Sequence, residues 1–418
     1  MWYKTIELSE VITDIAAGPF GSNLKVSCFV DFGFPIIDGA NLRGYKVTDN
    51  ITKYVTEEKA LSLYRSIAHR GDIVVTISGN VGQISYIPGD SKYEAYLCSQ
   101  RQFRVTFDTS LVYVPFLVFY FHTYEGQHKI LSFANQTGVP ALSQPLKNFK
   151  KIQIDLPSLD NQKRIASVIE KLNNKIELNA KINENLEQQV KALFYYMFIN
   201  SEDQSDWKKG TFSDLIESTI GGDWGKESPA GNYSEMVYCI RGADIPEVKA
   251  GNKGKMPTRY ILPKNYSSKH LRSGDIVVEI SGGSPTQSTG RVAAISQSLL
   301  DRYDRGMVCT NFCRAIKPKS GYSMFVYYYW QYLYDRNVFF SYENGTTGIK
   351  NLDLSGFITT EEIVIPPADI IQQFDCYCQS VFDQTFANGL ESEQLSILRN
   401  NLLPKLMSGE LDVSNINI

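Results

Sequence analysis

The sequence predicts an α+β protein with two similar mixed α/β domains, separated by two long helical regions that we expect to pair as antiparallel coiled-coil helices. Three observations give this prediction. A stretch of about 200 residues occurs twice, each copy is rich in strand and turn signals, and each copy is followed by a segment with helical periodicity. The chain therefore reads domain, helix, domain, helix.

The internal repeat is clearest in one nonapeptide. Gly71–Gly79 (GDIVVTISG) recurs as Gly274–Gly282 (GDIVVEISG), with eight identical residues in nine, at an offset of 203. Shorter matches follow in the same order: KTIELSEVI at 4–12 with KKGTFSDLI at 208–216, DGANL at 38–42 with RGADI at 241–245, TGVPAL at 137–142 with TGIKNL at 347–352, and IDLP at 154–157 with VIPP at 364–367. The period is too long for a solenoid, so we interpret it as a duplicated domain with divergent loops.

The repeat sets the domain boundaries that we predict: 1–157, 158–206, 207–365 and 366–418. The two helical regions, 158–206 and 366–418, hold 6 and 2 Lys+Arg against 8 and 7 Asp+Glu. The two domains hold 15 against 14 and 19 against 16. The net charge of −3 therefore comes from the helices, and the slightly basic domains remain compatible with phosphate binding through local clusters.

Each domain begins its repeat with a turn that leads into a buried strand. Asp72 and Asp275 stand at the start of the β-branched runs, where we expect them to cap turns rather than act as acid–base catalysts. The aromatic stretches 116–124 and 325–334 are expected to be core helices, with packing favoured over base stacking.

The first helical region starts at Ser158 and contains neither Gly nor Pro as far as Asn200. Its apolar positions keep a 4-3 spacing that is typical of a coiled-coil seam about 60 Å long, with two asparagines in the middle that are expected to set register. The seam consists of Ile165, Ile169, Leu172, Ile176, Asn179, Asn183, Leu186, Val190, Leu193 and Met197.

The second helical region follows Pro366-Pro367 and has a less regular seam. We expect Gly389 to weaken its middle and the helix to break near Pro404 and Gly409. Its apolar positions are Phe374, Val381, Phe382, Phe386, Leu390, Leu395, Leu398 and Leu402. The simplest partner for each long helix is the other one.

Patterns for catalysis and metal binding are missing from the sequence. It contains no P-loop, Gly-x-Ser-x-Gly or His-Glu-x-x-His motif, and Pro366-Pro367 lacks the Asn/Asp and the aromatic residue of a methyltransferase tetrapeptide. Cys309 and Cys313 have no second ligand pair nearby, so we expect no metal and reduced thiols. Without a signal peptide or a membrane-spanning run, we expect a cytoplasmic protein with no membrane partner.

The order of domains and helices resembles the specificity subunit of type I restriction–modification systems. The most specific pieces are Asp155-Leu-Pro157 leading into Gln162-Lys-Arg-Ile165, the Gly-Asp-Ile-Val-Val strands, and Leu402–Glu410, in which Pro404 departs from the expected helix former. The resemblance implies that each domain is a target-recognition domain for one half of a split, asymmetric site in double-stranded DNA. It also implies that the helices are a spacer and a docking surface for two methyltransferase (modification) subunits.

The same resemblance assigns all chemistry to partner subunits. The chain would be no enzyme and would bind no cofactor. S-adenosylmethionine is expected in the methyltransferase subunits, and ATP and Mg²⁺ in the restriction (motor–nuclease) subunits. The residues expected to pair the helices or dock partners are Ile165, Ile169, Leu172, Ile176, Leu186, Val190, Leu193, Phe374, Val381, Leu395 and Leu402.

Base edges in the major groove are read best by Arg at guanine and by Asn or Gln at adenine, and polar loops approach phosphates. The first-domain candidates are Ser22, Asn23, Lys25, Arg43, Asn80, Gln83, Arg101, Gln102, Arg104 and Thr137. The second-domain candidates are Trp224, Lys226, Arg241, Thr286, Gln287, Arg291, Asn311, Arg314, Thr346 and Thr347. Two alternatives remain open: a scaffold protein that binds no DNA, and the specificity subunit of another restriction type.

Overall fold

The computed structural model describes residues 3–135, 139–284, 286–345 and 349–413. The chain folds into two compact units. The first unit combines Met1–Asn173 with Ser396–Ile418, and the second is Asn174–Leu395. The limits of these units fall inside the two long helices, so each unit contains part of both helices.

The first unit contains two four-stranded sheets and two strand pairs. One sheet has the order β2-β9-β6-β7 and is antiparallel, and the other has the order β4-β3-β8-β5, in which β3 and β8 are parallel. The strands are β1 (Lys4–Glu7), β2 (Ile12–Ala17), β3 (Phe34–Ile37), β4 (Tyr54–Val55), β5 (Ile67–His69), β6 (Ile73–Thr76), β7 (Ile84–Tyr86), β8 (Ala95–Cys98), β9 (Gln102–Phe107), β10 (Ala134–Asn135), β11 (Ala141–Leu142) and β12 (Gln153–Leu156). The short helices are α1 (Glu57–Ser62), α2 (Val114–Phe121), α3 (Tyr124–Leu131) and α4 (Pro145–Lys150).

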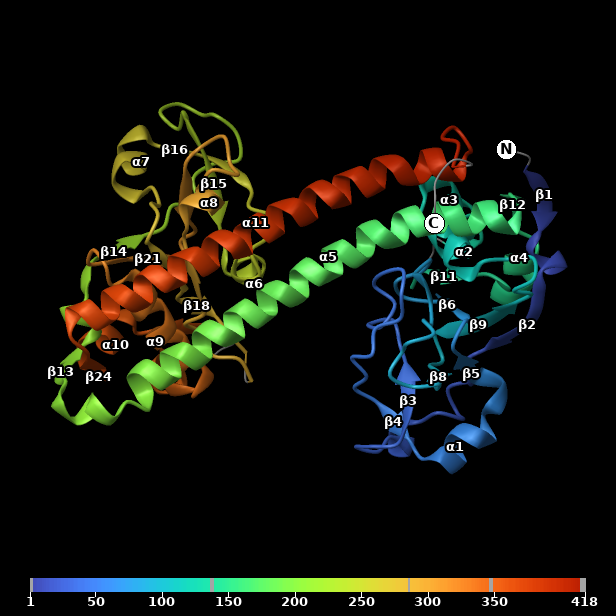
Figure 1. Cartoon of the computed structure of the whole chain (residues 1–418), viewed down its shortest axis with the longest axis horizontal. Helices are drawn as coiled ribbons and strands as arrows, with labels where there is room; N and C mark the ends of the chain where they lie inside the picture. The colour runs from blue at the N-terminus through green and yellow to red at the C-terminus, as the bar shows by residue number, and fades with distance from the viewer. Residues whose placement is uncertain (1–2, 136–138, 285, 346–348, 414–418) are drawn as a thin grey trace. The chain divides into compact units, whose positions relative to one another are not determined.

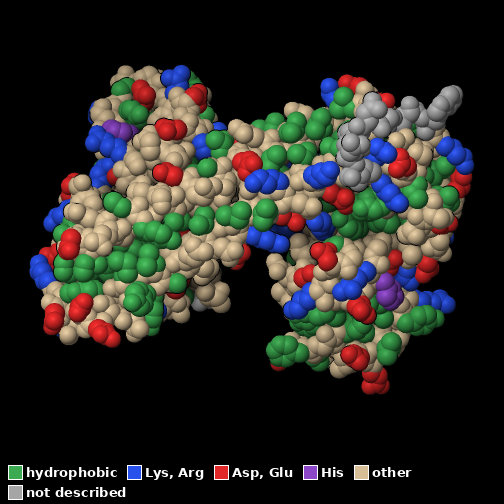
Figure 2. All heavy atoms as spheres, in the orientation of Figure 1, with side chains coloured by type: hydrophobic (Ala, Val, Ile, Leu, Met, Phe, Trp, Pro, Cys, Tyr) green, Lys and Arg blue, Asp and Glu red, His purple; other side chains and the backbone are tan. Residues whose placement is uncertain are grey.

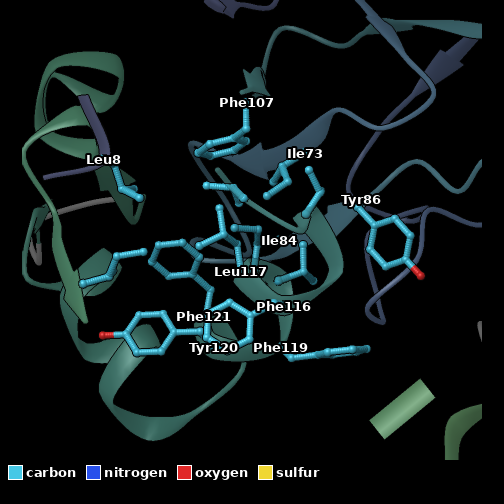
Figure 3. Close-up of a cluster of buried hydrophobic side chains, with 14 of the residues drawn as sticks. Leu8, Ile73, Ile84, Tyr86, Phe107, Phe116, Leu117, Phe119, Tyr120 and Phe121 are labelled. Atoms are coloured by element: carbon cyan, nitrogen blue, oxygen red, sulfur yellow. The ribbon is translucent and has the colours of Figure 1, made fainter. Parts of the chain in front are cut away.

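Helix α2 is the centre of the first core. All eight of its residues are buried, and Phe116, Leu117 and Phe121 pack with Ile73 of β6 and Ile84 of β7 (Figure 3). The predicted core role of this aromatic stretch is confirmed for the helix itself. Tyr124, which we included in the same stretch, lies in α3 and is 88% exposed.

The second unit repeats the strand plan of the first. Its main sheet has the order β14-β21-β17-β19, and a further sheet, β16-β15-β20, again contains a parallel pair, β15 with β20. The strands are β13 (Lys208–Thr211), β14 (Ile216–Gly221), β15 (Glu235–Ile240), β16 (Thr258–Ile261), β17 (Ile276–Glu279), β18 (Ser281–Gly282), β19 (Val292–Ala294), β20 (Met307–Cys309), β21 (Cys313–Pro318), β22 (Glu343–Asn344), β23 (Lys350–Leu352) and β24 (Glu362–Ile365). The short helices are α6 (Ile245–Lys249), α7 (Pro263–Lys269), α8 (Gln297–Leu300), α9 (Ser323–Asp335) and α10 (Leu354–Thr360).

The aspartates that open the repeated strands cap turns, as predicted. Asp72 accepts a hydrogen bond from the His69 N–H at 2.9 Å, and Asp275 accepts one from the Arg272 N–H at 2.8 Å. Both carboxylates are also anchored on the neighbouring strand, by Thr106 in the first unit and by Lys317 in the second. The duplication therefore preserves a buried polar anchor as well as the strand order.

The long helices are α5 (Leu159–Phe194) and α11 (Ala368–Met407), which lie side by side in Figure 1. Within the second unit, Lys175 pairs with Glu391, Asn179 donates to the carbonyl of Asn388, and Asn183 donates to that of Thr385. Rising numbers on α5 meet falling numbers on α11, so the helices are antiparallel, as the sequence predicts. No helix of the described residues is both long enough and apolar enough to cross a membrane.

The seam residues differ in burial. Ile165, Ile169, Val190, Phe374 and Val381 are buried, whereas Leu172, Ile176, Leu186, Leu193, Leu395 and Leu402 are half-buried. One expectation for α11 is wrong, because Leu390 and Leu398 are 41% and 45% exposed. The expected break near Pro404 and Gly409 is confirmed, although the helix does not stop at the proline itself. It continues to Met407 because Leu403, Leu406 and Met407 are buried in the first core, which stabilises the last turn despite the missing N–H.

Gly389 allows α11 to approach another backbone closely. A Cβ at this position would lie 1.9 Å from the carbonyl oxygen of Gly251, in the turn after α6. The same carbonyl accepts a hydrogen bond from Arg302, which also pairs with Glu393 of α11. The glycine that we expected to weaken the helix is therefore required for its packing within the second unit.

Candidate nucleic-acid interface

A groove with a volume of about 710 Å³ opens in the first unit. Its lining is mainly polar and combines amides and hydroxyls with basic side chains. Five of the predicted DNA-contacting residues line it, namely Arg43, Asn80, Gln83, Arg101 and Gln102. The other lining residues are Leu24, Val26, Phe29, Ile36, Asp38, Gly39, Ala40, Lys53, Thr76, Ser78, Gly79, Ser99 and Gln100. The structure thus brings together residues that lie far apart in the sequence.

Hydrogen bonds hold the amides that line this groove. Gln83 accepts from the Thr76 hydroxyl at 3.1 Å and donates to the Gly39 carbonyl at 3.2 Å, while Gln102 accepts from Ser99. Gln102 is buried, whereas Gln83 is half-buried and Asn80 is exposed. Gln83, Asn80 and the exposed Gln100 are therefore the amides that a ligand in the groove meets first.

The rim of the groove is basic. Arg43 and Arg101 are exposed, and Lys53 pairs with Asp38 at 2.8 Å. Burial disfavours the ionised form of Asp38, but hydrogen bonds from Lys53 and from the Ala40 N–H outweigh it and hold the pKa of Asp38 below its usual value. The pair neutralises the only carboxylate in the groove lining, so the two arginines dominate its charge.

Three further candidates lie on the loop that also carries the groove-lining residues Leu24 and Val26. Ser22, Asn23 and Lys25 are exposed, and the loop is fixed by a hydrogen bond from Gln100 to the Leu24 carbonyl at 2.8 Å. Their backbone is anchored while their side chains point to solvent, which suits contacts to phosphates.

Arg104 is a structural residue rather than a surface one. It is 8% exposed, and its guanidinium donates to Asp14 at 2.6 Å, to the Arg65 carbonyl at 3.0 Å and to Thr106 at 3.3 Å. The hydrogen bond from Arg104 lowers the pKa of Asp14. Since its nitrogens are already used inside the unit, we remove Arg104 from the DNA-contacting set.

The same backbone framework recurs in the second unit. Ile77 N–H donates to Arg101 O at 2.6 Å, and Ile280 N–H donates to Phe312 O at 2.9 Å. Ser99 N–H donates to Ile37 O, and Thr310 N–H donates to Ile240 O. These bonds make Arg101 and Phe312 equivalent, and likewise Ser99 and Thr310. Different side chains therefore stand on equivalent backbone.

Two predicted arginines of the second unit are held by carboxylates. Arg291 binds Glu279 through two hydrogen bonds of 2.6 and 2.7 Å, and Arg241 binds Asp244 through two of 2.8 and 3.0 Å. Both side chains remain partly exposed, with 24% of the Arg291 side chain and 37% of the Arg241 side chain accessible. Each carboxylate fixes its guanidinium, and Nη2 of Arg241 also donates to the Lys255 carbonyl at 2.7 Å.

The remaining candidates occupy varied surroundings. Asn311, Arg314, Thr286, Gln287 and Lys226 are exposed. Trp224 is half-buried beneath the guanidinium of Arg259, 3.7 Å from its ring centre, so its face is already covered. Thr137, Thr346 and Thr347 lie outside the described residues.

The family model described as "Type I restriction modification DNA specificity domain" matches residues 33–188 and 204–395. The chain belongs to this family. The two matches reproduce the duplication, so the chain is a type I restriction–modification specificity subunit with duplicated target-recognition domains, as the resemblance predicts. A specificity subunit is non-catalytic, so the prediction that the chain is no enzyme is confirmed.

Two relatives are similar over most of their length. The type I restriction enzyme MjaIX specificity subunit of Methanocaldococcus jannaschii is 23% identical over 393 residues, covering 88% of this chain and 83% of the relative. The HindI specificity subunit of Haemophilus influenzae is 21% identical over 406 residues, covering 82% and 87%. The crystal structure of the type I system S subunit from M. genitalium has a TM-score of 0.56 at 13% identity and covers 97% of this chain and 96% of that one, which supports the fold.

One surface residue of the specificity subunit escaped the sequence analysis. Phe312 is 62% exposed between Asn311 and the strand that carries Arg314. Its equivalence to Arg101 depends on strand pairing across loops of unequal length, so the sequence repeat gave no signal for it.

Among the described residues, no three or more His, Cys, Asp or Glu side chains are placed to hold a metal ion.

Proposed function

We propose that this specificity subunit reads a two-part, asymmetric sequence in double-stranded DNA, with one part read by each domain. The observation that carries the proposal is the pairing of one backbone framework with two sets of side chains. At equivalent positions the first domain has Arg101 and Ser99, and the second has Phe312 and Thr310. Two copies of one reader would keep the same side chains, whereas readers of different sequences require different ones.

In the first domain, the groove is the reading surface. Gln83 and Asn80 contact base edges, and Arg43 and Arg101 contact guanine or phosphate at the rim. The loop carrying Ser22, Asn23 and Lys25 positions the backbone of the DNA, and Gln102 supports the floor of the groove. These residues span neutral and basic chemistry, as a sequence-specific surface requires.

In the second domain, the equivalent surface reads the other part. Arg241 and Arg291, held by their carboxylates, contact base edges together with Gln287 and Asn311, and Arg314 contacts phosphate. Thr286 and Lys226 add phosphate contacts beside them. Trp224 supports the surface through Arg259, and Thr137, Thr346 and Thr347 remain candidates by sequence alone.

The paired helices act as a spacer between the two readers and dock two methyltransferase subunits. Both helices carry exposed apolar side chains, among them Leu178 on α5 and Leu390, Ile397 and Leu398 on α11, and Figure 2 shows hydrophobic side chains gathered over the helices of the second unit. An exposed apolar surface of this kind is typical of a protein interface. The partners supply the chemistry: S-adenosylmethionine in the methyltransferase subunits, and ATP and Mg²⁺ in the restriction subunits that join them in the cytoplasm.

The test is to co-express the chain with its methyltransferase subunits and to map methylated adenines across a host genome by sequencing. We expect a split motif with a fixed gap that disappears when this gene is deleted. Exchanging residues 1–157 for the same segment of another specificity subunit should change one half of the motif and keep the other half and the gap. Unchanged methylation after deletion, or a change in both halves after the exchange, would contradict the proposal.

A further inference from the structure

One position in the repeated nonapeptide differs between the two domains, and in the first domain it lines the groove. Thr76 ends β6 in the first domain, and Glu279 ends β17 in the second. Each residue faces one partner on the return strand: Thr76 N–H donates to Gln83 O at 2.9 Å, and Glu279 N–H donates to Arg291 O at 2.9 Å. The duplication has therefore exchanged a Thr–Gln pair for a Glu–Arg pair on equivalent backbone.

The first pair fixes the amide of Gln83. The Gly39 carbonyl accepts from Nε2, and the Thr76 hydroxyl donates to Oε1, so the two ends of the amide are distinguished. Among the described residues these are the hydrogen bonds of that side chain. An amide has two N–H donors and two acceptor lone pairs. One donor and one acceptor of Gln83 therefore remain for a ligand in the groove, which Gln83 lines.

The second pair fixes the guanidinium of Arg291. Nε and Nη2 each donate to one oxygen of Glu279, at 2.7 and 2.6 Å. Glu279 is 6% exposed, and a Cβ at Gly242 would lie 2.2 Å from its Oε1, so the carboxylate occupies a tight space that glycine provides. Within the described part of the chain, the three other N–H groups of the guanidinium have no protein acceptor, and all three are donors.

We infer that this pair is the base-selecting position of each domain: Gln83 reads adenine in the part recognised by the first domain, and Arg291 reads guanine in the part recognised by the second. The inference rests on the proposed function and names the bases for it. Adenine presents a donor and an acceptor in the major groove, which match one acceptor and one donor of an amide. Guanine presents two acceptors, which match two donors of a guanidinium.

Thr76 and Glu279 are positioning residues in this arrangement. Thr76 binds the amide of Gln83, and Glu279 binds the guanidinium of Arg291. Each leaves the remaining donors and acceptors of that group for the base. The Arg291–Glu279 bonds are shorter than those of Gln83, in keeping with a charge-assisted pair. Gly39 and Gly242 provide the space that the two side-chain pairs occupy, because a Cβ at Gly39 would also lie only 3.1 Å from Gln83 Oε1.

The experiment exchanges the two pairs in the full chain and purifies it with its methyltransferase subunits. Binding is measured on duplexes that carry each of the four base pairs at one position of the cognate site, taken through every position. For T76E/Q83R we expect one position in the first half to change from adenine to guanine, by roughly ten- to a hundredfold in relative affinity, as one bidentate contact gives. For E279T/R291Q we expect one position in the second half to change from guanine to adenine. Each exchange is the control for the other, since the unaltered half must keep its preference.

Three results would overturn the inference: a preference that stays unchanged in both exchanges, a change in the wrong half, or an equal loss of affinity for all duplexes. If an exchanged chain does not assemble with its partners, Gln83→Glu and Arg291→Lys decide, since they keep size or charge but alter the donor–acceptor pattern. Each should then lower the preference at its one position about tenfold or more. If the unaltered complex shows no sequence preference at all, the proposed function itself fails, which separates the two outcomes.

Discussion

Replacing Gly389 with alanine tests how closely α11 packs against the turn that contains Gly251. Both residues belong to the second unit, and the new Cβ would lie 1.9 Å from the Gly251 oxygen and 2.7 Å from its carbonyl carbon. These are backbone atoms, and the oxygen is held by Arg302 at 2.8 Å. The clash therefore cannot be relieved by turning a side chain.

Two opposing effects set the magnitude. Alanine in place of glycine inside a helix favours the helix by about 1 kcal/mol. Extra volume in a packed region costs about 1–3 kcal/mol, and a backbone contact this short lies at the upper end of that range. Displacing Gly251 also strains the hydrogen bond from Arg302, which pairs with Glu393 at 2.7 Å. We expect Gly389→Ala to lower the free energy of unfolding of the second unit by about 1–2 kcal/mol.

Urea unfolding followed by tryptophan fluorescence is the assay. Of the four tryptophans in the chain, Trp207, Trp224 and Trp330 belong to the second unit, so the signal reports mainly on that unit. Gln394→Ala, at an exposed position of the same helix, is the matched control and should leave stability within about 0.5 kcal/mol. A rise in stability of about 1 kcal/mol for Gly389→Ala would refute the argument, because helix propensity alone would then act.

Three further predictions address binding, pH dependence and docking. Alanine at Arg241, Gln287 and Arg291 together should lower the affinity for cognate DNA at least tenfold in a binding titration, whereas alanine at the exposed Arg305 should not; unchanged affinity would remove these residues from the interface. Burial lowers the pKa of His122, which contacts the Ile84 carbonyl, so the unfolded chain binds more protons and stability falls as the pH drops below about 6.5. Hydrogen exchange in α2 should therefore speed up, after correction for intrinsic rates, between about pH 7.5 and 5.5, and His122→Gln should flatten that dependence. Leu178→Asp with Leu390→Asp should reduce co-purification of the methyltransferase subunits, with Lys181→Ala as control; full retention would place the docking surface elsewhere.

The strand plan was predictable because the repeat carries its own alignment. Two runs of β-branched residues, each opened by Gly-Asp, predicted buried strands, and β6 and β17 occupy them. The turn roles of Asp72 and Asp275 also followed from sequence, since a short acidic side chain at a turn binds nearby N–H groups. Local chemistry decided these features, so a local pattern was enough.

Features decided by distant neighbours were not predictable. Gly389 and Pro404 read as helix breakers by propensity, yet Gly251 requires the first and the buried Leu406 and Met407 support the helix around the second. The sequence predicts that Arg104 contacts DNA, but its guanidinium pairs with Asp14, which lies 90 positions away in the sequence. Tertiary contacts decide all three cases. For the two helix positions they override a propensity that is worth only about 1 kcal/mol for glycine and about 3 kcal/mol for proline.

The asparagines of the helical seam show how the second unit fixes the register of its helices. Asn183 donates to the carbonyls of Ala250 and Thr385 and accepts from Asn388, while Asn179 donates to α11 at Glu391. An apolar seam tolerates several registers, because one leucine contact resembles another. A slip of one turn would leave these buried amides without partners, at a cost of about 1–3 kcal/mol each. The spacing function proposed for the helices therefore depends on the polar residues of the seam, and the apolar ones supply most of the stability.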